Sequence, residues 1–246
     1  MTRRLILLLF ITITACDKET AWDAVKTRGD AEIVHVSLPT FHAVTVENRI
    51  NLVLVQGDSY SARIEGWKNL NPKIKMTVDQ DGMLFIDDTN GYNFVRSRDN
   101  RTTVFLSFPD EIHTLYFKGD GYIISNDTIN LSHITVYSIG ASGSIDLKLK
   151  ANSIYAGANQ TSVTTYTIRG TTQSLGMGNW GFGPLDLSNL ETSTADIHHR
   201  GTGNVYLNVS ESLSATIYGA GNAYYKGDPT INLTRIGKGN LFQMKK

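Results

Sequence analysis

The chain of 246 residues is poor in cysteine and in charge. It has one cysteine, which excludes an internal disulfide framework and every multi-cysteine zinc or iron–sulfur site. Charged residues make up 19%, and 23 basic side chains balance 23 acidic ones. The chain therefore offers no cationic field for nucleic acid, which we do not expect as a partner. With 41% hydrophobic residues, the composition is that of a globular protein.

The first sixteen residues have the pattern of a bacterial lipoprotein signal. Arg3 and Arg4 precede the apolar run Leu5–Ile11, which is too short to span a bilayer as a mature helix. Residues 13–16 (ITAC) resemble a lipobox, and the single cysteine stands where that motif requires it. We therefore expect a signal peptide over residues 1–15, lipidation of Cys16 and a tether to residue 30. The lipid would anchor the protein in a membrane of the cell envelope, with the outer membrane as the expected location.

Residues 31–118 alternate between apolar and polar side chains, in segments of four to seven residues separated by turn formers. This period of two predicts β-strands with short connections. Asp81-Gly82 predicts a hairpin turn between residues 73–78 and 83–88, because glycine readily takes the positive φ that such turns need. No stretch of twelve residues keeps a helical period, so little helix is expected.

From Lys118 onward, short turns of glycine and asparagine recur every 16 to 25 residues. Repeats of this length predict the coils of a solenoid. The second small residue of each turn is Gly121, Gly143, Asn159, Gly178, Gly203, Gly221 or Gly239. We expect positive φ at these corners. The residue that follows is Asn179, Asn204, Asn222 or Asn240 in four coils, which predicts a ladder of stacked side-chain amides.

Offsets from the second small residue predict which side chains of each coil face inward. Positions two and four are mostly apolar and are expected to face the core. They are Ile123, Ile145, Thr161, Trp180, Val205, Ala223 and Leu241, and then Ser125, Leu147, Val163, Phe182, Leu207, Tyr225 and Gln243. Position three faces outward and carries Tyr206, Tyr224 and Phe242 in the last three coils. This outward row is a candidate ligand-binding strip for sugar rings, and a structural ladder covered by another segment is the alternative.

The order of these segments resembles a known family. The signal and lipobox are followed by FHAVTVENRINLVLVQGDSYSARIEGWKNLNPKIKMTV, then by YNFVRS, then by the GxGN coils. This arrangement is similar to the auto-transporter adhesin head GIN domain family of Bacteroidetes-type bacteria, over roughly Trp22 to Gln243. The resemblance implies a right-handed β-helical fold and a cell-envelope location. It brings no catalytic residues with it.

We accordingly predict an all-β protein built as a right-handed parallel β-helix with a less regular N-terminal strand region. The single solenoid is expected over residues 31–246, with irregular strands over 31–109 and GxGN coils over 110–246. The alternative is two domains, a β-sandwich followed by a solenoid.

The predicted function is a non-catalytic module for adhesion, binding or scaffolding, with a glycan or an envelope protein as partner. The competing class is a polysaccharide lyase or hydrolase, which needs two or three carboxylates converging on one cleft. The acids of the coils lie at different offsets from their turns: Asp120, Asp146, Asp186, Glu191, Asp196, Glu211 and Asp228. No cofactor or metal is expected, because the turns carry asparagine where calcium-binding rolls have aspartate, and the adjacent His198 and His199 point to opposite faces of a strand.

Overall fold

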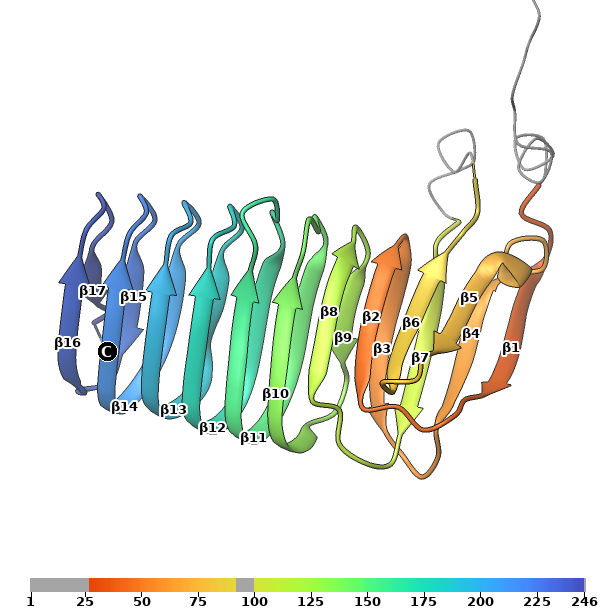
Figure 1. The fold of residues 1–246 in the computed structure, drawn as a ribbon, viewed down its shortest axis with the longest axis horizontal. Helices are drawn as coiled ribbons and strands as arrows, with labels where there is room; N and C mark the ends of the chain where they lie inside the picture. Colours follow the sequence, from red (N-terminus) through yellow and green to blue (C-terminus); the bar gives the residue numbers. More distant parts are fainter. Residues whose placement is uncertain (1–26, 92–99, 246) are drawn as a thin grey trace, which may run out of the picture.

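The computed structural model describes residues 27–91 and 100–245. The predicted signal peptide, Cys16 and the YNFVRS segment therefore lie outside the described residues. The described chain is a β-solenoid in which strands stack side by side in two layers along one axis (Figure 1). This confirms the all-β, β-helical prediction with its less regular N-terminal region. Within the described part, the one helical element is the short 3-10 turn η1 (Asn71–Lys73), and no helix there is long and apolar enough to cross a bilayer.

The strands of the N-terminal region are short and change direction. They are β1 (Ala31–Ser37), β2 (Ala43–Asn48), β3 (Ile50–Gln56), β4 (Ser61–Trp67), β5 (Ile74–Val78), β6 (Met83–Asp88) and β7 (Thr102–Phe108). β1 pairs with β4, β4 with β7 and β5 with β6, all antiparallel. The antiparallel strands β1, β4 and β5 lie at one end of the stack (Figure 1). As predicted, Gly82 makes the β5–β6 hairpin turn at a φ of 68°.

The remaining strands pair in parallel and form the regular coils. They are β8 (Thr114–Gly119), β9 (Tyr122–Ser125), β10 (Ile129–Ser138), β11 (Ser144–Ala158), β12 (Thr165–Asn179), β13 (Leu185–His199), β14 (Val205–Ile217), β15 (Ala223–Lys226), β16 (Thr230–Arg235) and β17 (Leu241–Gln243). Each long strand from β11 to β14 bends in its middle. Its second half joins one ladder and its first half joins the other.

We call the two parallel ladders the first and the second. The first runs through β6, β2, β8 and β10, then the second halves of β11 to β14, and ends at β16. The second runs through β7, β3 and β9, then the first halves of β11 to β14, and ends at β15 and β17. The coil made by β2 and β3 thus lies between the coil of β6 and β7 and that of β8 and β9.

The core fills the space between the two ladders as one continuous cluster. It begins with Phe41 and Leu52 in the N-terminal region and continues through Tyr166 to Tyr225. Tyr166 is the largest fully buried side chain, and its hydroxyl donates a hydrogen bond of 2.5 Å to the carbonyl of Gly157. Burial raises the pKa of this phenol. Apolar packing therefore extends without a break across both parts of the chain.

Candidate ligand-binding site

The register of the predicted coils is correct in five turns and wrong in two. Strand pairing and backbone hydrogen bonds stack Gly121, Gly143, Thr164, Gly183, Gly203, Gly221 and Gly239 in one column. Gly178 and Asn179 instead lie at the end of β12. Asn159 lies in a turn, where its side-chain oxygen accepts hydrogen bonds from the backbone N–H groups of Gly140 and Thr161, but it is not in the column.

Because the predicted register is wrong in these two coils, four side chains that we expected to face inward are exposed instead. Thr161 is exposed, and Val163, Trp180 and Phe182 are 48%, 46% and 56% exposed. They lie on the turns, where the Arg200 guanidinium lies 5.5 Å from the centre of the Trp180 ring. The core positions of these two coils belong instead to Tyr166, Ile168, Leu185 and Leu187. In the last coil Gln243 is also exposed.

The turn glycines are required by close packing and not by positive φ. Among the described residues, the glycines with positive φ are Gly29, Gly82, Gly140, Gly170 and Gly227. A Cβ on Gly203 would run into the backbone carbonyl of Gly183, and one on Gly239 into that of Gly221. The turns at these two glycines thus rest directly on the backbone of the turn before them, and the contact leaves no room for a Cβ.

The asparagine ladder forms in the last three coils and includes Asn204, Asn222 and Asn240. The side-chain oxygen of Asn204 accepts a hydrogen bond from the backbone N–H of Asn222 at 3.2 Å, and that of Asn222 accepts one from Asn240 at 3.0 Å. The contacts are therefore between side chain and backbone. Pro184 takes the equivalent position one coil earlier, and Asn179 is fully buried elsewhere.

The three predicted outward aromatic residues form a stacked row on the second ladder. Tyr206 pairs with Tyr224, and Tyr224 pairs with Phe242, through the strands β14, β15 and β17. Their ring centres are 5.1 and 5.5 Å apart, with interplanar angles of 15° and 28°. Tyr206 and Tyr224 are partly exposed and Phe242 is 44% exposed. The rings thus present a flat aromatic strip to the outside, which we call the aromatic row.

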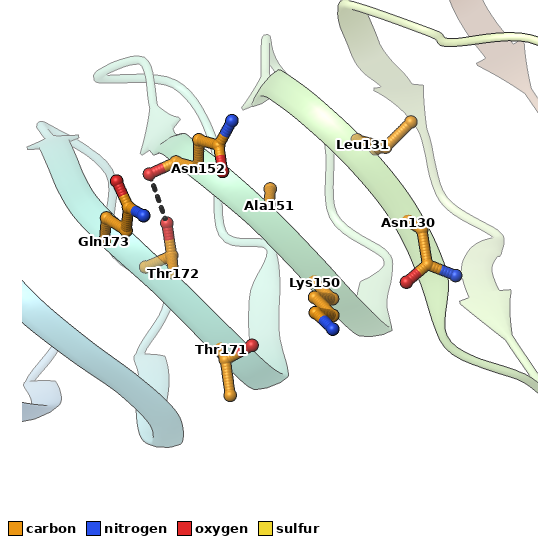
Figure 2. A pocket seen from close by; sticks show the side chains of 8 residues that line it. All are labelled: Asn130, Leu131, Lys150, Ala151, Asn152, Thr171, Thr172 and Gln173. Carbon is orange, nitrogen blue, oxygen red and sulfur yellow. Dashed lines mark hydrogen bonds between the residues drawn. The ribbon is translucent and has the colours of Figure 1, made fainter.

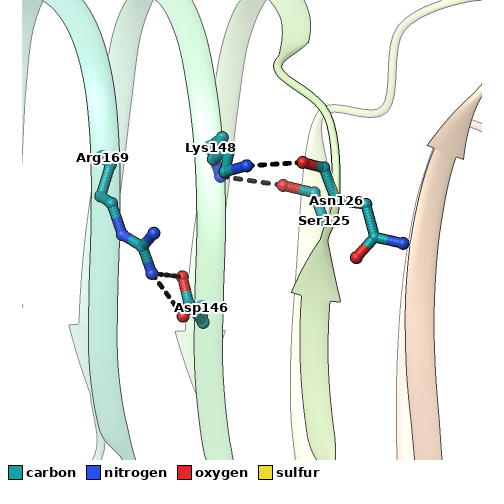
Figure 3. Close-up of polar contacts among 5 residues, drawn as sticks. All are labelled: Ser125, Asn126, Asp146, Lys148 and Arg169. Carbon is teal, nitrogen blue, oxygen red and sulfur yellow. Dashed lines mark hydrogen bonds and ion pairs between the residues drawn. The ribbon is translucent and has the colours of Figure 1, made fainter.

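The same outward position is polar or charged in the three coils before the aromatic row. Strand pairing continues the aromatic row backward through Asp186 and Thr167 to Asp146. Figure 3 shows Asp146 accepting two hydrogen bonds from Arg169, while Lys148 binds Asn126 and Ser125 through its side chain and its backbone N–H. The aromatic surface therefore begins at Tyr206, one strand after Asp186.

A shallow polar groove lies along the bends in the middle of the long strands and leads towards the aromatic row. One part is lined by Asn130, Leu131, Lys150, Ala151, Asn152, Thr171, Thr172 and Gln173 (Figure 2). The hydroxyl of Thr172 donates a 3.2 Å hydrogen bond to the carbonyl of Asn152 and so ties two coils together. The next part shares Thr171 and Thr172 and reaches Asn208, two residues after Tyr206 on β14. Amides, hydroxyls and the charged side chains of Lys150 and Glu191 thus lead up to the aromatic row.

A second aromatic surface on the first ladder was missed by the sequence analysis. Tyr137 and Tyr155 stack with ring centres 6.4 Å apart. A Cβ on Gly157 would come within 2.8 Å of the Tyr137 ring, and the Tyr155 ring lies against Gly176 and Gly178. Burial raises the pKa of both phenols. The glycines within these strands, which leave room for flat rings, are the signal in the sequence.

A cluster of two imidazoles and a carboxylate was also missed. Glu111, His113 and His133 bring one donor atom each to within 4.8 Å of one another. Among residues 27–91 and 100–245, no other three acidic or imidazole side chains converge in this way. The seven acids considered for catalysis are not part of this cluster. The spacing of twenty residues between the two histidines, one coil, is the signal that could have found it.

The adjacent histidines of β13 behave as predicted. His199 is fully buried, whereas the side chain of His198 is 51% exposed and its Nε2 lies 3.8 Å from a carboxylate oxygen of Asp196. The two imidazoles therefore face opposite sides of the strand.

The parallel solenoid defines the class of fold, and comparison with known proteins gives the family. Residues 40–229 match the family described as "Putative auto-transporter adhesin, head GIN domain", and the chain belongs to it. No curated protein matches the chain.

Solved structures of low sequence identity share the fold. A protein titled a putative adhesin from Bacteroides fragilis is 20% identical with a TM-score of 0.77, covering 87% of this chain and 97% of that one. Two proteins from Parabacteroides distasonis, titled a putative adhesin and a putative lipid binding protein, are each 17% identical, with TM-scores of 0.67 and 0.68. Both matches cover 88% of this chain and 98% of the other.

Proposed function

We propose that the protein is a non-catalytic, adhesin-like module of the cell envelope that binds a glycan along the aromatic row. Membership of the adhesin family supports the adhesin-like role and the envelope location. The observation that carries the ligand class is the stacked row of Tyr206, Tyr224 and Phe242 on the outside of the second ladder. Aromatic faces suit the apolar faces of sugar rings, and the polar edges of such sugars need hydrogen-bonding groups close by.

The surroundings of the aromatic row supply those polar groups. Asn208 and Lys226 follow the two tyrosines by two residues on the same strands and pair with each other across β14 and β15. Lys226 is exposed, and its ammonium group donates a 3.4 Å hydrogen bond to the carbonyl of Ser188. All three rings are at least partly exposed and follow one line across the coils, so a chain of sugar units fits the row better than a single small molecule does.

The test is binding of soluble polysaccharides to the purified mature protein and to the variant Tyr224→Ala. We expect the variant to lose roughly 1–3 kcal/mol of binding free energy, with little change in melting temperature, because Tyr224 is the central ring of the row. Tyr155→Ala is the matched control, since it removes an outward tyrosine of the other ladder and should bind as the wild type does. Lower stability of Tyr224→Ala with unchanged binding would instead identify the row as a structural ladder.

The same samples separate binding from catalysis. A polysaccharide lyase or hydrolase would release unsaturated products or new reducing ends, and changing one carboxylate would abolish this. We expect polysaccharide to be recovered intact after incubation with the protein.

The proposal includes anchoring through a lipid on Cys16, in the outer membrane. The lipobox and the single cysteine support it. Labelled fatty acid should enter the wild-type chain in cells and should not enter Cys16→Ala. Equal labelling of both would overturn the anchor while leaving glycan binding untouched.

A further inference from the structure

The fold brings two imidazoles together on β10 and at the start of β8, two neighbouring strands of the first ladder, far along the chain from the aromatic row. His113 directly precedes β8, and His133 lies in β10, the neighbouring strand. The carbonyl of His113 accepts a 2.8 Å hydrogen bond from the backbone N–H of Thr135, which fixes the two strands next to each other. The rings stack with centres 4.3 Å apart and planes 9° from parallel.

A carboxylate is held beside this pair by the same strand. Ser132, the residue before His133, donates hydrogen bonds to Oε1 of Glu111 from its backbone N–H, at 3.0 Å, and from its hydroxyl. The other oxygen, Oε2, lies 3.9 Å from Nδ1 of His113. That Nδ1 is shielded from solvent and makes no hydrogen bond to any described residue. The carboxylate is thus oriented from behind, with one oxygen left for a further ligand.

We infer that Glu111, His113 and His133 form a binding site for a divalent transition metal of the zinc type. Two imidazoles and one carboxylate are a donor set that binds zinc in proteins, with a fourth position left for water or another ligand. Zinc bonds of about 2.0–2.1 Å bring tetrahedral ligand atoms to roughly 3.3 Å from one another. The donor atoms now lie within 4.8 Å, and the partly exposed side chains of His113 and Glu111 and the exposed His133 can rotate to close that difference.

The surroundings leave the fourth position accessible. Next to Glu111 and His113 the surface is hollowed between Thr40, His42, Tyr60 and Asp110. His42 directly precedes β2, the neighbouring strand, and its ring centre lies 5.9 Å from that of His113. Tyr60 donates a 2.9 Å hydrogen bond to Asp110, so that carboxylate is already engaged. The hollow is large enough for water or a small ligand to complete the metal's coordination.

Calorimetric titration of the tag-free protein with zinc chloride tests the site. We expect one ion per chain, with micromolar or tighter affinity, and at least a tenfold loss of affinity in His113→Ala, His133→Ala and Glu111→Gln. His198→Ala is the matched control, because His198 lies beside a single carboxylate and has no third donor; it should bind zinc as the wild type does. Tyr224→Ala should also keep full zinc affinity, which separates this site from the aromatic row.

Copper(II) gives a second readout that does not depend on an affinity. Its electron paramagnetic resonance spectrum should show coupling to two imidazole nitrogens in the wild type and to one in His133→Ala. Circular dichroism confirms that each variant is folded, and Glu111→Gln keeps the shape of the side chain should an alanine variant fail to fold. Binding of less than one zinc ion per chain, or wild-type affinity in folded His133→Ala or Glu111→Gln, would overturn the inference.

Discussion

The two ends of the solenoid are built in different ways. In the N-terminal region the chain reaches its neighbours out of order, since the coil of β2 and β3 packs between those of β6–β7 and β8–β9, and three antiparallel strands close the end. From β10 onward each coil simply follows the one before it. In the described chain the last strand of the first ladder, β16, is exposed along all six residues.

The difference shows what each kind of pairing contributes. Sequential coils bury their apolar positions against the next coil, and the last coil of the described residues leaves Ile231 and Leu233 41% and 44% exposed. At the other end, β1, β4 and β5 run antiparallel to their neighbours and cover the end of the stack, with Ala62 and Ile64 of β4 buried. These strands cover the apolar end of the core, as the atypical terminal repeats of solenoids do.

The largest expected effects come from the shared core, which tests whether the two regions unfold together. Tyr166→Ala in the coils should lower the free energy of unfolding by about 3–5 kcal/mol and Leu52→Ala in β3 by about 2–5 kcal/mol, because both side chains are fully buried. Since β2 pairs directly with β8 and β3 pairs directly with β9, both variants should shift one common unfolding transition.

Tryptophans in the two regions supply the measurement. Thermal unfolding followed by fluorescence in variants that keep only Trp67 or only Trp180, with the other two tryptophans changed to phenylalanine, should give the same midpoint as circular dichroism. If Leu52→Ala shifted only a separate, N-terminal transition, the regions would be two cooperative units, as in the sandwich-plus-solenoid alternative.

A smaller effect distinguishes the two roles of glycine in the two regions. Gly203 in the coils lies against the backbone of Gly183, so Gly203→Ala should destabilise by about 3 kcal/mol. Gly82 in the N-terminal hairpin has positive φ and faces only the movable ring of His42, so Gly82→Ala should cost about 1–2 kcal/mol. Asparagine tolerates positive φ but carries a Cβ. Gly82→Asn should therefore recover stability in denaturant titrations, whereas Gly203→Asn should not; recovery at both sites would mean that φ matters in the coils too.

The sequence predicted the coils well because a coil repeats its own pattern. Alternation of apolar residues and the 18-residue spacing from Gly203 to Gly221 to Gly239 were enough to place Tyr206, Tyr224 and Phe242 in one outward row. The order of the N-terminal strands was not predictable in this way. Alternation with a period of two shows which side chains face inward, but it does not show which strand is the neighbour. The contact between β2 and β8 therefore had no local signal.

The error at Gly178 has a similar cause. The sequence there contains two pairs of spaced glycines, Gly176 and Gly178 in β12 and then Gly181 and Gly183 in the turn, and the motif alone does not choose between them. Packing does choose, because Gly183 lies beneath Gly203. The cluster of Glu111, His113 and His133 was missed for a different reason. His113 and His133 lie outside the glycine turns on which the coils were aligned.

The smallest expected effect concerns one buried side chain and how stability depends on pH. His199 occupies the core position that Asn179 takes one coil earlier and Ile217 takes one coil later. Burial lowers the pKa of its imidazole, and the backbone groups of Asn179 and Gly203 oppose this shift. The folded protein therefore resists protonation of His199, while the unfolded chain takes up a proton near the ordinary pKa of about 6.5.

The sign of the pH effect follows from these two states. Above pH 6.5 both states are neutral at this residue and it adds no pH dependence. As the pH falls below that value, the unfolded chain binds more protons than the folded one, so stability declines until the folded pKa is reached. His199→Asn copies the neighbouring coil and removes the proton-binding group, so its melting temperature should fall less between pH 7 and pH 5 than that of the wild type. His198→Asn, on the outer face of the same strand, should keep the wild-type decline, and an equal decline in His199→Asn would show that other groups govern acid stability.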